Sequence, residues 1–238
     1  MSKLILLRHG QSVWNAENRF TGWVDIDLSQ KGVEEAKKAG QLIKDLNLSL
    51  DISYTSFLKR AIKTLTTVLK ENQMDLTFNT SWEMNERHYG ALTGLNKDEM
   101  KKKLGEKKIH EFRRSWDLRP EPLSKNNPYH PVNIEIYKSL PKEDIPDTES
   151  LKDTYERVVK YYRKNIEDKI KDNKNVLISA HGNSIRSLCK FLFKLNEIQI
   201  TKLEIPTGNP MIIEFDKRKK ILNCRYLDKE RAQDLIVF

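Results

Sequence analysis

Cysteine is scarce in this chain of 238 residues, which contains only Cys189 and Cys224. Two thiols cannot build a disulfide framework, and no Cys or His spacing matches a zinc site. Each cysteine lies in a segment with an apolar pattern, so we expect both thiols to be buried and reduced. The sequence therefore excludes a small disulfide-rich secreted protein and predicts no bound metal.

Long apolar runs are also missing. None approaches the roughly 20 residues that a membrane-spanning helix needs. The apolar start from Met1 to Leu7 is too short for a signal peptide. We therefore expect a cytoplasmic protein that does not associate with membranes. With 38% hydrophobic residues, the chain has enough apolar side chains for the core of one domain spanning residues 1–238.

Positive charge is in excess, with 43 Lys and Arg against 34 Asp and Glu and a formal net charge of +9. Such an excess can favour nucleic acid or a membrane surface. However, the lysines are spread along the chain and interleaved with acids, as in Glu34–Lys38, which is typical of a solvated surface. We expect no nucleic-acid partner, because a small anionic substrate explains the arginines described below.

Strand and helix patterns alternate along the chain. Strands are predicted over residues 3–7, 51–55, 76–78, 175–180, 211–215 and 221–226, the last two as a hairpin. Helices are predicted from a Ser29 cap to Leu46, from a Ser56 cap to Leu69, more weakly over 97–116, from Ser150 to Ile170, and over 184–195. This order predicts an α/β fold, a three-layer α/β/α sandwich with a mostly parallel central sheet.

Residues 118–148 contain six of the eight prolines and little periodicity. A connection of this length is too extended for an ordinary loop. We interpret it as a lid, an ordered surface excursion or an oligomer contact.

Two histidines each follow a predicted strand and precede a glycine, in Arg8-His9-Gly10 and His181-Gly182. Ligands of open α/β sheets bind outside the carboxyl ends of the strands. If the two strands are neighbours, the imidazoles face one another across a pocket. A neutral imidazole can act as a nucleophile and carry a phosphoryl group, which divides one difficult displacement into two easier ones.

Phosphoryl transfer also needs positive charge, and the sequence has no cluster of acids for a metal. Arg8 adjoins His9, and Arg60 lies near a predicted helix start, where amide dipoles also favour an anion. Glu86, in the stretch 83–90, is a candidate proton carrier for a substrate hydroxyl. The adjacent Arg113 and Arg114 suit a substrate with a carboxylate and a phosphate, or else belong to a solvated face.

Together these elements resemble the histidine phosphatase superfamily, and within it the cofactor-dependent phosphoglycerate mutases. Leu7-Arg8-His9-Gly10 with His181 is the signal of the superfamily. The longer signal of the mutase branch covers nearly the full chain in the family's order: 8–15, 18–23, 54–61, 85–90, 95–97, Arg113-Arg114, 180–184 and 205–208.

The resemblance implies an isomerase of glycolysis and gluconeogenesis that interconverts 3-phosphoglycerate and 2-phosphoglycerate through a phosphohistidine. The primer would be 2,3-bisphosphoglycerate, with no metal, and the protein would be a homo-oligomer, a dimer or tetramer. His9 would carry the phosphoryl group, Glu86 would be the acid/base, and Arg8, Arg60 and His181 would hold the transferring group. The positions matching substrate contacts are Asn15, Thr21, Gly22, Arg87, Tyr89, Lys97, Arg113, Arg114, Gly182 and Asn183.

Two departures from the mutase pattern leave a second enzymatic activity open. Gln11 stands where many mutases have Glu, and the chain stops at Phe238, short of the Gly/Lys/Ala-rich tail of this branch. Easier access of water to the phosphohistidine would favour a phosphatase. A shift of the main reaction to making bisphosphate would instead give a bisphosphoglycerate synthase. A non-catalytic phosphate-binding module would be expected to lack one of His9, Arg60, Glu86 or His181, and all are present.

Overall fold

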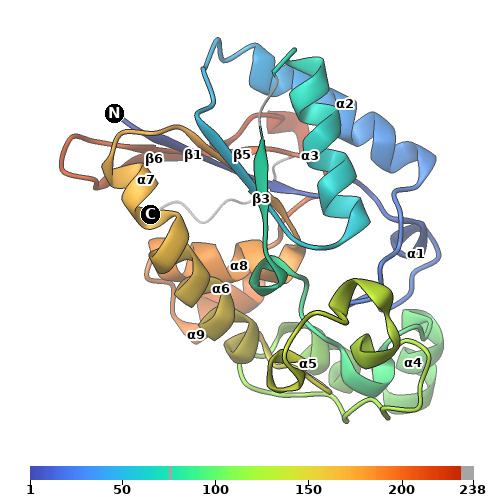
Figure 1. Cartoon of the computed structure of the whole chain (residues 1–238). Coiled ribbons are helices and arrows are strands. Elements are labelled where there is room, and N and C mark those ends of the chain that lie inside the picture. The colour runs from blue at the N-terminus through green and yellow to red at the C-terminus, as the bar shows by residue number, and fades with distance from the viewer. Residues whose placement is uncertain (75–76, 232–238) are drawn as a thin grey trace.

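The computed structural model describes residues 1–74 and 77–231, which form a layered α/β structure (Figure 1). Its central sheet has six strands in the order β3-β2-β4-β1-β5-β6. β1 pairs in parallel with β4, β4 with β2, and β2 with β3, whereas β5 runs antiparallel to β1 and β6. The strands are β1 (Lys3–Arg8), β2 (Ile52–Thr55), β3 (Phe78–Thr80), β4 (Val176–Ala180), β5 (Met211–Phe215) and β6 (Ile221–Tyr226). The mostly parallel α/β fold predicted from the sequence is confirmed.

Helices cover both faces of this sheet (Figure 1). On one face lie α2 and α3, and on the other α6 and α8. The helices are α1 (Val13–Ala16), α2 (Gln30–Lys44), α3 (Lys59–Glu71), α4 (Lys97–Leu104), α5 (Glu106–Arg114), α6 (Leu151–Asn165), α7 (Glu167–Lys171), α8 (Gly182–Leu192) and α9 (Glu197–Lys202). None of the described helices has both the length and the apolar character needed to cross a bilayer.

The two-sided burial of the sheet follows from the alternation of side chains along a strand. On β1, Leu4 and Leu6 pack with residues of α6 and α8, while Ile5 and Leu7 pack with residues of α2 and α3. All four side chains are buried, which explains why the segment is continuously apolar. This burial fixes the strand and therefore the place where Arg8 and His9 leave it.

Several predicted boundaries differ from the structure. The predicted Ser56 cap is wrong: α3 is preceded by Leu58 at the N-cap, and the Ser56 hydroxyl accepts a hydrogen bond from the Leu58 amide at 3.1 Å. The helix expected over 97–116 is divided into α4 and α5 at Gly105, whose φ is +87°. α6 and α7 are likewise separated at Ile166.

Other differences lie at element ends. α8 begins two residues before its predicted start. β3 begins at Phe78, and residue 76 of the predicted strand lies outside the described residues, as does the chain end at 238. Cys189 is buried and Cys224 half-buried, and both are free thiols, with burial raising the pKa of Cys224 to about 12.

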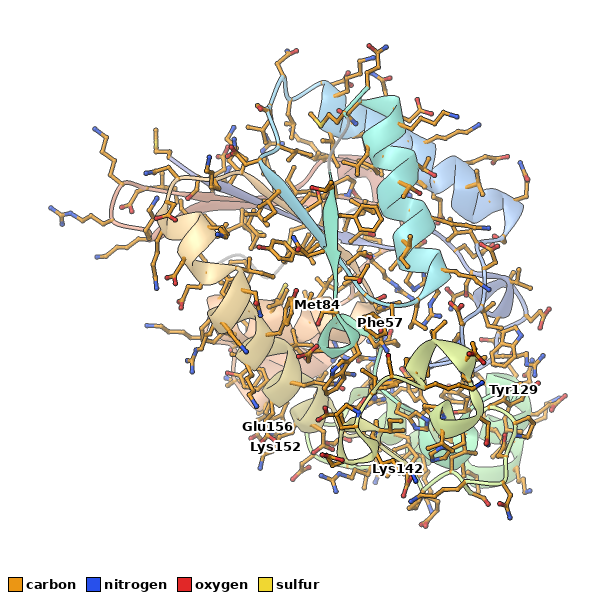
Figure 2. The ribbon with its side chains drawn as sticks, viewed as in Figure 1. Phe57, Met84, Tyr129, Lys142, Lys152 and Glu156 are labelled. Carbon is orange, nitrogen blue, oxygen red and sulfur yellow. The ribbon has the colours of Figure 1, made fainter. Side chains whose placement is uncertain are left out.

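The proline-rich segment 118–148 is an ordered surface excursion with short 3-10 turns. Figure 2 shows its labelled Tyr129 and Lys142 at the lower end of the molecule, away from α2. The Tyr137 side chain is fully buried, donates to the Trp23 carbonyl at 2.7 Å and accepts from the Asn85 amide at 3.2 Å. These bonds attach the segment to the two loops that flank the candidate site.

The first turn of α2 touches the loop that follows β1. A Cβ atom on Gly32 would lie 2.0 Å from the carbonyl oxygen of Gln11, and one on Gly10 would lie 2.1 Å from the carbonyl oxygen of Gly32. Ser29 and Gln11 are also joined by a backbone hydrogen bond of 2.9 Å. Only glycine permits this approach, which holds the backbone beside His9.

We expect Gly32→Ala to destabilise the fold by about 1–3 kcal/mol or more, because backbone rather than a flexible side chain occupies the space of the new methyl group. Urea unfolding would measure this change. Lys37→Ala, at an exposed position of the same helix, is the control and should stay within about 0.5 kcal/mol of the parent protein. Equal stability of both variants would contradict this account of the contact.

Candidate active site

The parallel pairing of β1 and β4 places the two histidines side by side. Arg8 is in register with Ala180, and the His9 amide continues the ladder by donating to the Ala180 carbonyl at 3.0 Å. The rings of His9 and His181 then meet edge to face with centroids 5.0 Å apart. The predicted proximity of the two histidines is therefore confirmed, but the prediction that they face one another across a pocket is wrong, because the rings are in direct contact and His181 lines neither of the two cavities of the site.

The His9 imidazole is arranged as a neutral nucleophile. Its Nδ1 lies 2.6 Å from the Gly10 carbonyl oxygen, and a carbonyl can only accept, so Nδ1 carries the proton and Nε2 the lone pair. Burial, then the charges of Arg60 and Arg8, hold the pKa of His9 well below its usual value. The ring is consequently uncharged at neutral pH.

His181 lies behind His9 rather than in an open pocket. It is fully buried, and its Nε2 lies 2.7 Å from the Ser56 hydroxyl. Burial, followed by the charge of Arg60 with a further contribution from Arg8, holds its pKa well below the usual value. Its Nδ1 is buried and has no hydrogen-bond partner among the described residues. Ser56, expected only as a helix cap, is thus the residue that orients His181.

Arg60 and Arg8 bring positive charge to the two rings. The buried Arg60 guanidinium donates to the carbonyls of Val24 and Gly22, both at 2.8 Å. Burial lowers the pKa of Arg60 to about 10, so it remains a cation at neutral pH. Arg8 donates to the Ile205 carbonyl at 2.7 Å. Carbonyl oxygens orient both side chains without cancelling their charge.

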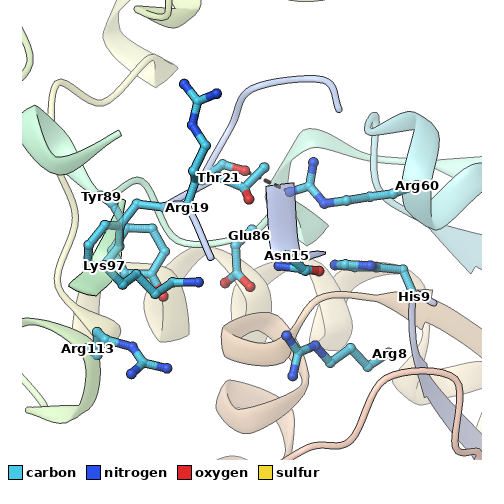
Figure 3. A pocket seen from close by; sticks show the side chains of 12 residues that line it. Arg8, His9, Asn15, Arg19, Thr21, Arg60, Glu86, Tyr89, Lys97 and Arg113 are labelled. Carbon is cyan, nitrogen blue, oxygen red and sulfur yellow. Dashed lines mark hydrogen bonds between the residues drawn. The ribbon is translucent and has the colours of Figure 1, made fainter. Parts of the chain in front are cut away.

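The Glu86 carboxylate faces this cationic group from the other side of the site (Figure 3). Its Oε1 accepts from the Arg87 amide at 2.8 Å, the Asn183 amide at 3.2 Å and the Asn183 side-chain nitrogen at 2.8 Å. Asn183 lies in the first turn of α8, directly after His181 and Gly182. The sheet edge and the helix start therefore fix the acid relative to the histidines.

Two adjoining cavities surround Glu86. The histidine cavity is lined by Arg8, His9, Asn15, Arg19, Phe20, Thr21, Gly22, Arg60, Glu86, Tyr89, Lys97 and Arg113. The arginine cavity is lined by Arg8, Glu86, Tyr89, Arg113, Arg114, Gly182, Asn183, Arg186, Glu204 and Ile205. Together they bring thirteen of the fifteen predicted site residues to one place. His181 and Arg87 line neither cavity.

Small polar side chains leave donors free at the wall of the histidine cavity. Asn15 accepts from the Ser12 amide through its Oδ1 at 3.2 Å, which leaves the side-chain NH2 for another partner. The Thr21 hydroxyl is buried without a hydrogen-bond partner among the described residues. Such unpaired buried groups are costly unless a ligand satisfies them.

The remaining cations of the predicted set differ in burial and in their partners. Burial, then the charges of Arg113 and Arg8, lowers the pKa of Lys97 to about 8. Arg87 is fully buried, with its guanidinium over the ring of Tyr89 and donating to the Phe112 carbonyl, so it supports the wall of the site. Arg114 forms an ion pair with the exposed Glu204.

Several residues of the site were absent from the predicted set. Arg19 lies over the ring of Trp14 at 4.1 Å and donates to the Gly94 carbonyl at 2.7 Å. It belongs to a matched stretch, so its charge was an available signal. Ser56 also belongs to a matched stretch, but its pattern indicated only a helix cap. Arg186 and Glu204 reach the site through the packing of α8 and its neighbours, which no local pattern reveals. Among residues 1–74 and 77–231, no three His, Cys, Asp or Glu side chains form a group able to hold a metal.

Comparison with known proteins identifies the family to which this chain belongs. The profile of the histidine phosphatase superfamily (branch 1) matches residues 4–130 and 127–226. The 2,3-bisphosphoglycerate-dependent phosphoglycerate mutase of Pelagibacter ubique is 62% identical over the full length of both chains.

Solved structures with the same fold include a mutase and a phosphatase. Phosphoglycerate mutase from Bacillus anthracis matches with a TM-score of 0.63 and 26% identity, covering 89% of this chain and 87% of that one. The alpha-ribazole phosphatase of Shigella flexneri matches with a TM-score of 0.68 and 19% identity, covering 93% and 94%, and shows the fold alone. By its sequence profile and its full-length relative, this chain belongs to the histidine phosphatase superfamily.

Proposed function

We propose that this protein interconverts 3-phosphoglycerate and 2-phosphoglycerate, with His9 as the transient carrier of the phosphoryl group. The observation that carries the proposal is the neutral, buried His9, whose Nε2 carries a lone pair beside the guanidinium groups of Arg8 and Arg60. The identity of 62% to a 2,3-bisphosphoglycerate-dependent phosphoglycerate mutase over the whole chain supports the choice of substrate.

In the first half-reaction, the 2-hydroxyl oxygen of 3-phosphoglycerate attacks the phosphorus held on His9. A P–O bond forms as the P–N bond breaks, and Glu86 takes the hydroxyl proton. In the second half-reaction, His9 Nε2 takes the phosphoryl group from the C3 oxygen, and Glu86 returns the proton to that oxygen. The enzyme ends in the phosphorylated state in which it began.

The cationic side chains stabilise the transferring group in both halves. Arg8 and Arg60 lie nearest His9, and their positions are fixed before substrate arrives because backbone carbonyls already hold them. Arg113 lines both cavities and Arg114 the second, so they suit the carboxylate and the remaining phosphate. His181 contacts His9 and Ser56, so it would hold the nucleophilic ring in place for the transferring group.

The residues present also fit 2,3-bisphosphoglycerate as the primer. The unpaired Thr21 hydroxyl and Arg8 Nε, together with Arg60, Lys97 and Arg113, would hold a molecule with two phosphates. When bound, this primer supplies the phosphoryl group that first loads His9. We further expect a cytoplasmic homo-oligomer, a dimer or tetramer.

The test of this function separates the mutase from a phosphatase or bisphosphoglycerate synthase that uses the same histidine. With 3-phosphoglycerate as substrate, phosphorus NMR should show 2-phosphoglycerate as the main product, with stimulation by catalytic 2,3-bisphosphoglycerate. EDTA should have no effect. Release of inorganic phosphate faster than formation of the isomer would favour the phosphatase, and accumulation of bisphosphate would favour the synthase.

Replacing His9 with Ala should lower turnover more than about 10⁴-fold and abolish the phosphoenzyme, because the only atom proposed to bond phosphorus is removed. Radiolabelled bisphosphoglycerate followed by acid and alkali stability of the protein-bound label would measure the phosphohistidine. His110→Ala, at an exposed position, is the matched control. Undiminished labelling of the His9 variant would exclude His9 as the carrier.

Lys97 should make substrate binding depend on pH. Its pKa of about 8 means that it is a cation below that pH and loses its charge above it. We therefore expect kcat/KM to fall, mainly through KM, as the pH rises from 7 to 9 at constant ionic strength. Lys97→Met should lower kcat/KM about 10-fold or more at pH 7 and flatten this decline. A Lys97→Met enzyme with the same alkaline decline as the parent would assign the effect to another group.

A further inference from the structure

The side-chain amide of Asn183 has hydrogen-bond partners at both ends. Its nitrogen donates to Glu86 Oε1 at 2.8 Å and to the Tyr89 hydroxyl at 3.1 Å. Its Oδ1 accepts from Nη1 of Arg186 at 2.9 Å. A continuous chain of side chains therefore runs from Arg186 through Asn183 to the candidate acid/base.

Arg186 is a buried side chain in the wall of the arginine cavity. It lies three residues after Asn183 on α8, so both side chains share one face of the helix. Only 2% of its surface is exposed, and its other terminal nitrogen donates to the carbonyl of Ile200. Burial, then the charges of Arg114 and Arg87, lowers the pKa of Arg186 to about 9, which leaves it cationic at neutral pH.

The guanidinium decides which way the amide points. Arginine can only donate hydrogen bonds, so the atom of Asn183 that faces it must be the oxygen. The NH2 group is then forced toward Glu86. If the amide turned over, its oxygen would face the carboxylate and the NH2 group would face a cation, and both contacts would be repulsive.

This orientation distinguishes the two oxygens of Glu86. Oε1 accepts the bonds from the Arg87 amide and from the backbone and side chain of Asn183. Oε2 instead lies toward Gly182, 3.7 Å from where a Cβ atom would stand on that residue. With Oε1 occupied by donors, Oε2 is the oxygen available for a substrate proton.

We propose that Arg186 is a positioning residue that fixes the Asn183 amide, keeps Glu86 Oε1 occupied and leaves Oε2 to exchange the substrate proton. This inference rests on the proposed acid/base role of Glu86. It assigns no contact between Arg186 and substrate, although Arg186 lines the arginine cavity. Direct binding of an anion by Arg186 is the competing explanation, and kinetics separate the two.

The test uses R186M, which removes every donor but keeps a long side chain. We expect kcat to fall about 10-fold or more, because the Glu86 carboxylate loses its side-chain donor and keeps only two backbone amides on Oε1, while KM changes less than about 2-fold. The acid limb of the pH profile of kcat/KM should move to higher pH, because a freely turning amide no longer donates steadily to the ionised carboxylate. A large rise in KM with unchanged kcat would overturn the proposal in favour of direct binding.

K190M is the matched control on the same helix. Lys190 is also a long cation on α8. Its ammonium donates to the backbone carbonyl of Leu195 at 2.7 Å, and within the described part of the chain it has no hydrogen bond to Asn183. We expect K190M to keep the parent kcat and pH profile. If K190M shifts the acid limb as R186M does, loss of charge from α8 explains the effect and the proposal fails.

A double-mutant cycle tests whether Arg186 acts through Asn183. In an N183A background there is no amide to orient, so adding R186M should change kcat by less than about 2-fold. A further 10-fold loss would show that Arg186 acts by another route. Should R186M not fold, N183D replaces it: the aspartate keeps an oxygen for Arg186 but removes the donor to Glu86, and a parent-like kcat and pH profile would overturn the proposal.

Failure of the role proposed for Arg186 can be distinguished from failure of the proposed function. If the parent protein forms no 2-phosphoglycerate, the proposed function fails before any variant is made. If the parent is active and labels His9 but R186M matches it in kcat and pH profile, only the role of Arg186 is wrong.

Discussion

The site depends on guanidinium groups that are held by backbone carbonyl oxygens instead of carboxylates. Arg8, Arg60, Arg87 and Arg186 each donate to a carbonyl, and none of them has an acidic side chain within ion-pair distance among the described residues. A neutral carbonyl acceptor fixes the direction of a guanidinium group but does not cancel its positive charge. Gathering like charges in a buried site opposes folding, so a core on both faces of the sheet must offset it. An anionic ligand removes this cost when it binds, which couples substrate affinity to the stability of the folded state.

Two buried histidines remain neutral beside these cations. Burial is the largest cause of the lowered pKa of both His9 and His181, and the charges of Arg60 and Arg8 add to it. Protonated imidazole has no lone pair, so a site that attracts phosphate through cations also keeps its nucleophile reactive. Arg157 is the informative contrast. It pairs with the buried Glu149 and donates to carbonyls of the loop that carries Glu86, so its charge is compensated and its role is to fix that loop.

The sequence predicted the parts of this arrangement that depend on local pattern. Apolar runs ending in His9 and His181 identified the central strands, and parallel strands bring their carboxyl ends to one edge of a sheet. Arg60 and Glu86 were already candidates, one near a predicted helix start and the other in a polar loop stretch. Their roles and the remaining contacts required the resemblance to a family, because nothing local distinguishes them from surface charges. Ser56 and Arg186 were missed. Ser56 has the pattern of an ordinary helix cap, and Arg186 has the pattern of a single charge on an apolar helix, so neither pattern indicates a place in the site. Ser56 becomes a neighbour of His181 only when β2 and β4 pair. Arg186 contacts Asn183 within α8, but the link from Asn183 to Glu86 forms only when α8 packs beside the loop that carries the acid.

Fold alone does not separate a mutase from a phosphatase, because structures of both kinds match this chain at similar TM-scores. The distinction lies in what competes with water for the phosphohistidine. On the proposed function, the substrate hydroxyl must be nearer the phosphorus than any water molecule, which requires the far end of the substrate to be held. The arginine cavity, with Arg113 and Arg114 beside Asn183, provides anchoring charge on the opposite side of Glu86 from His9. On the proposed function, the arginine cavity would therefore select the acceptor, while the histidine cavity would hold the phosphohistidine.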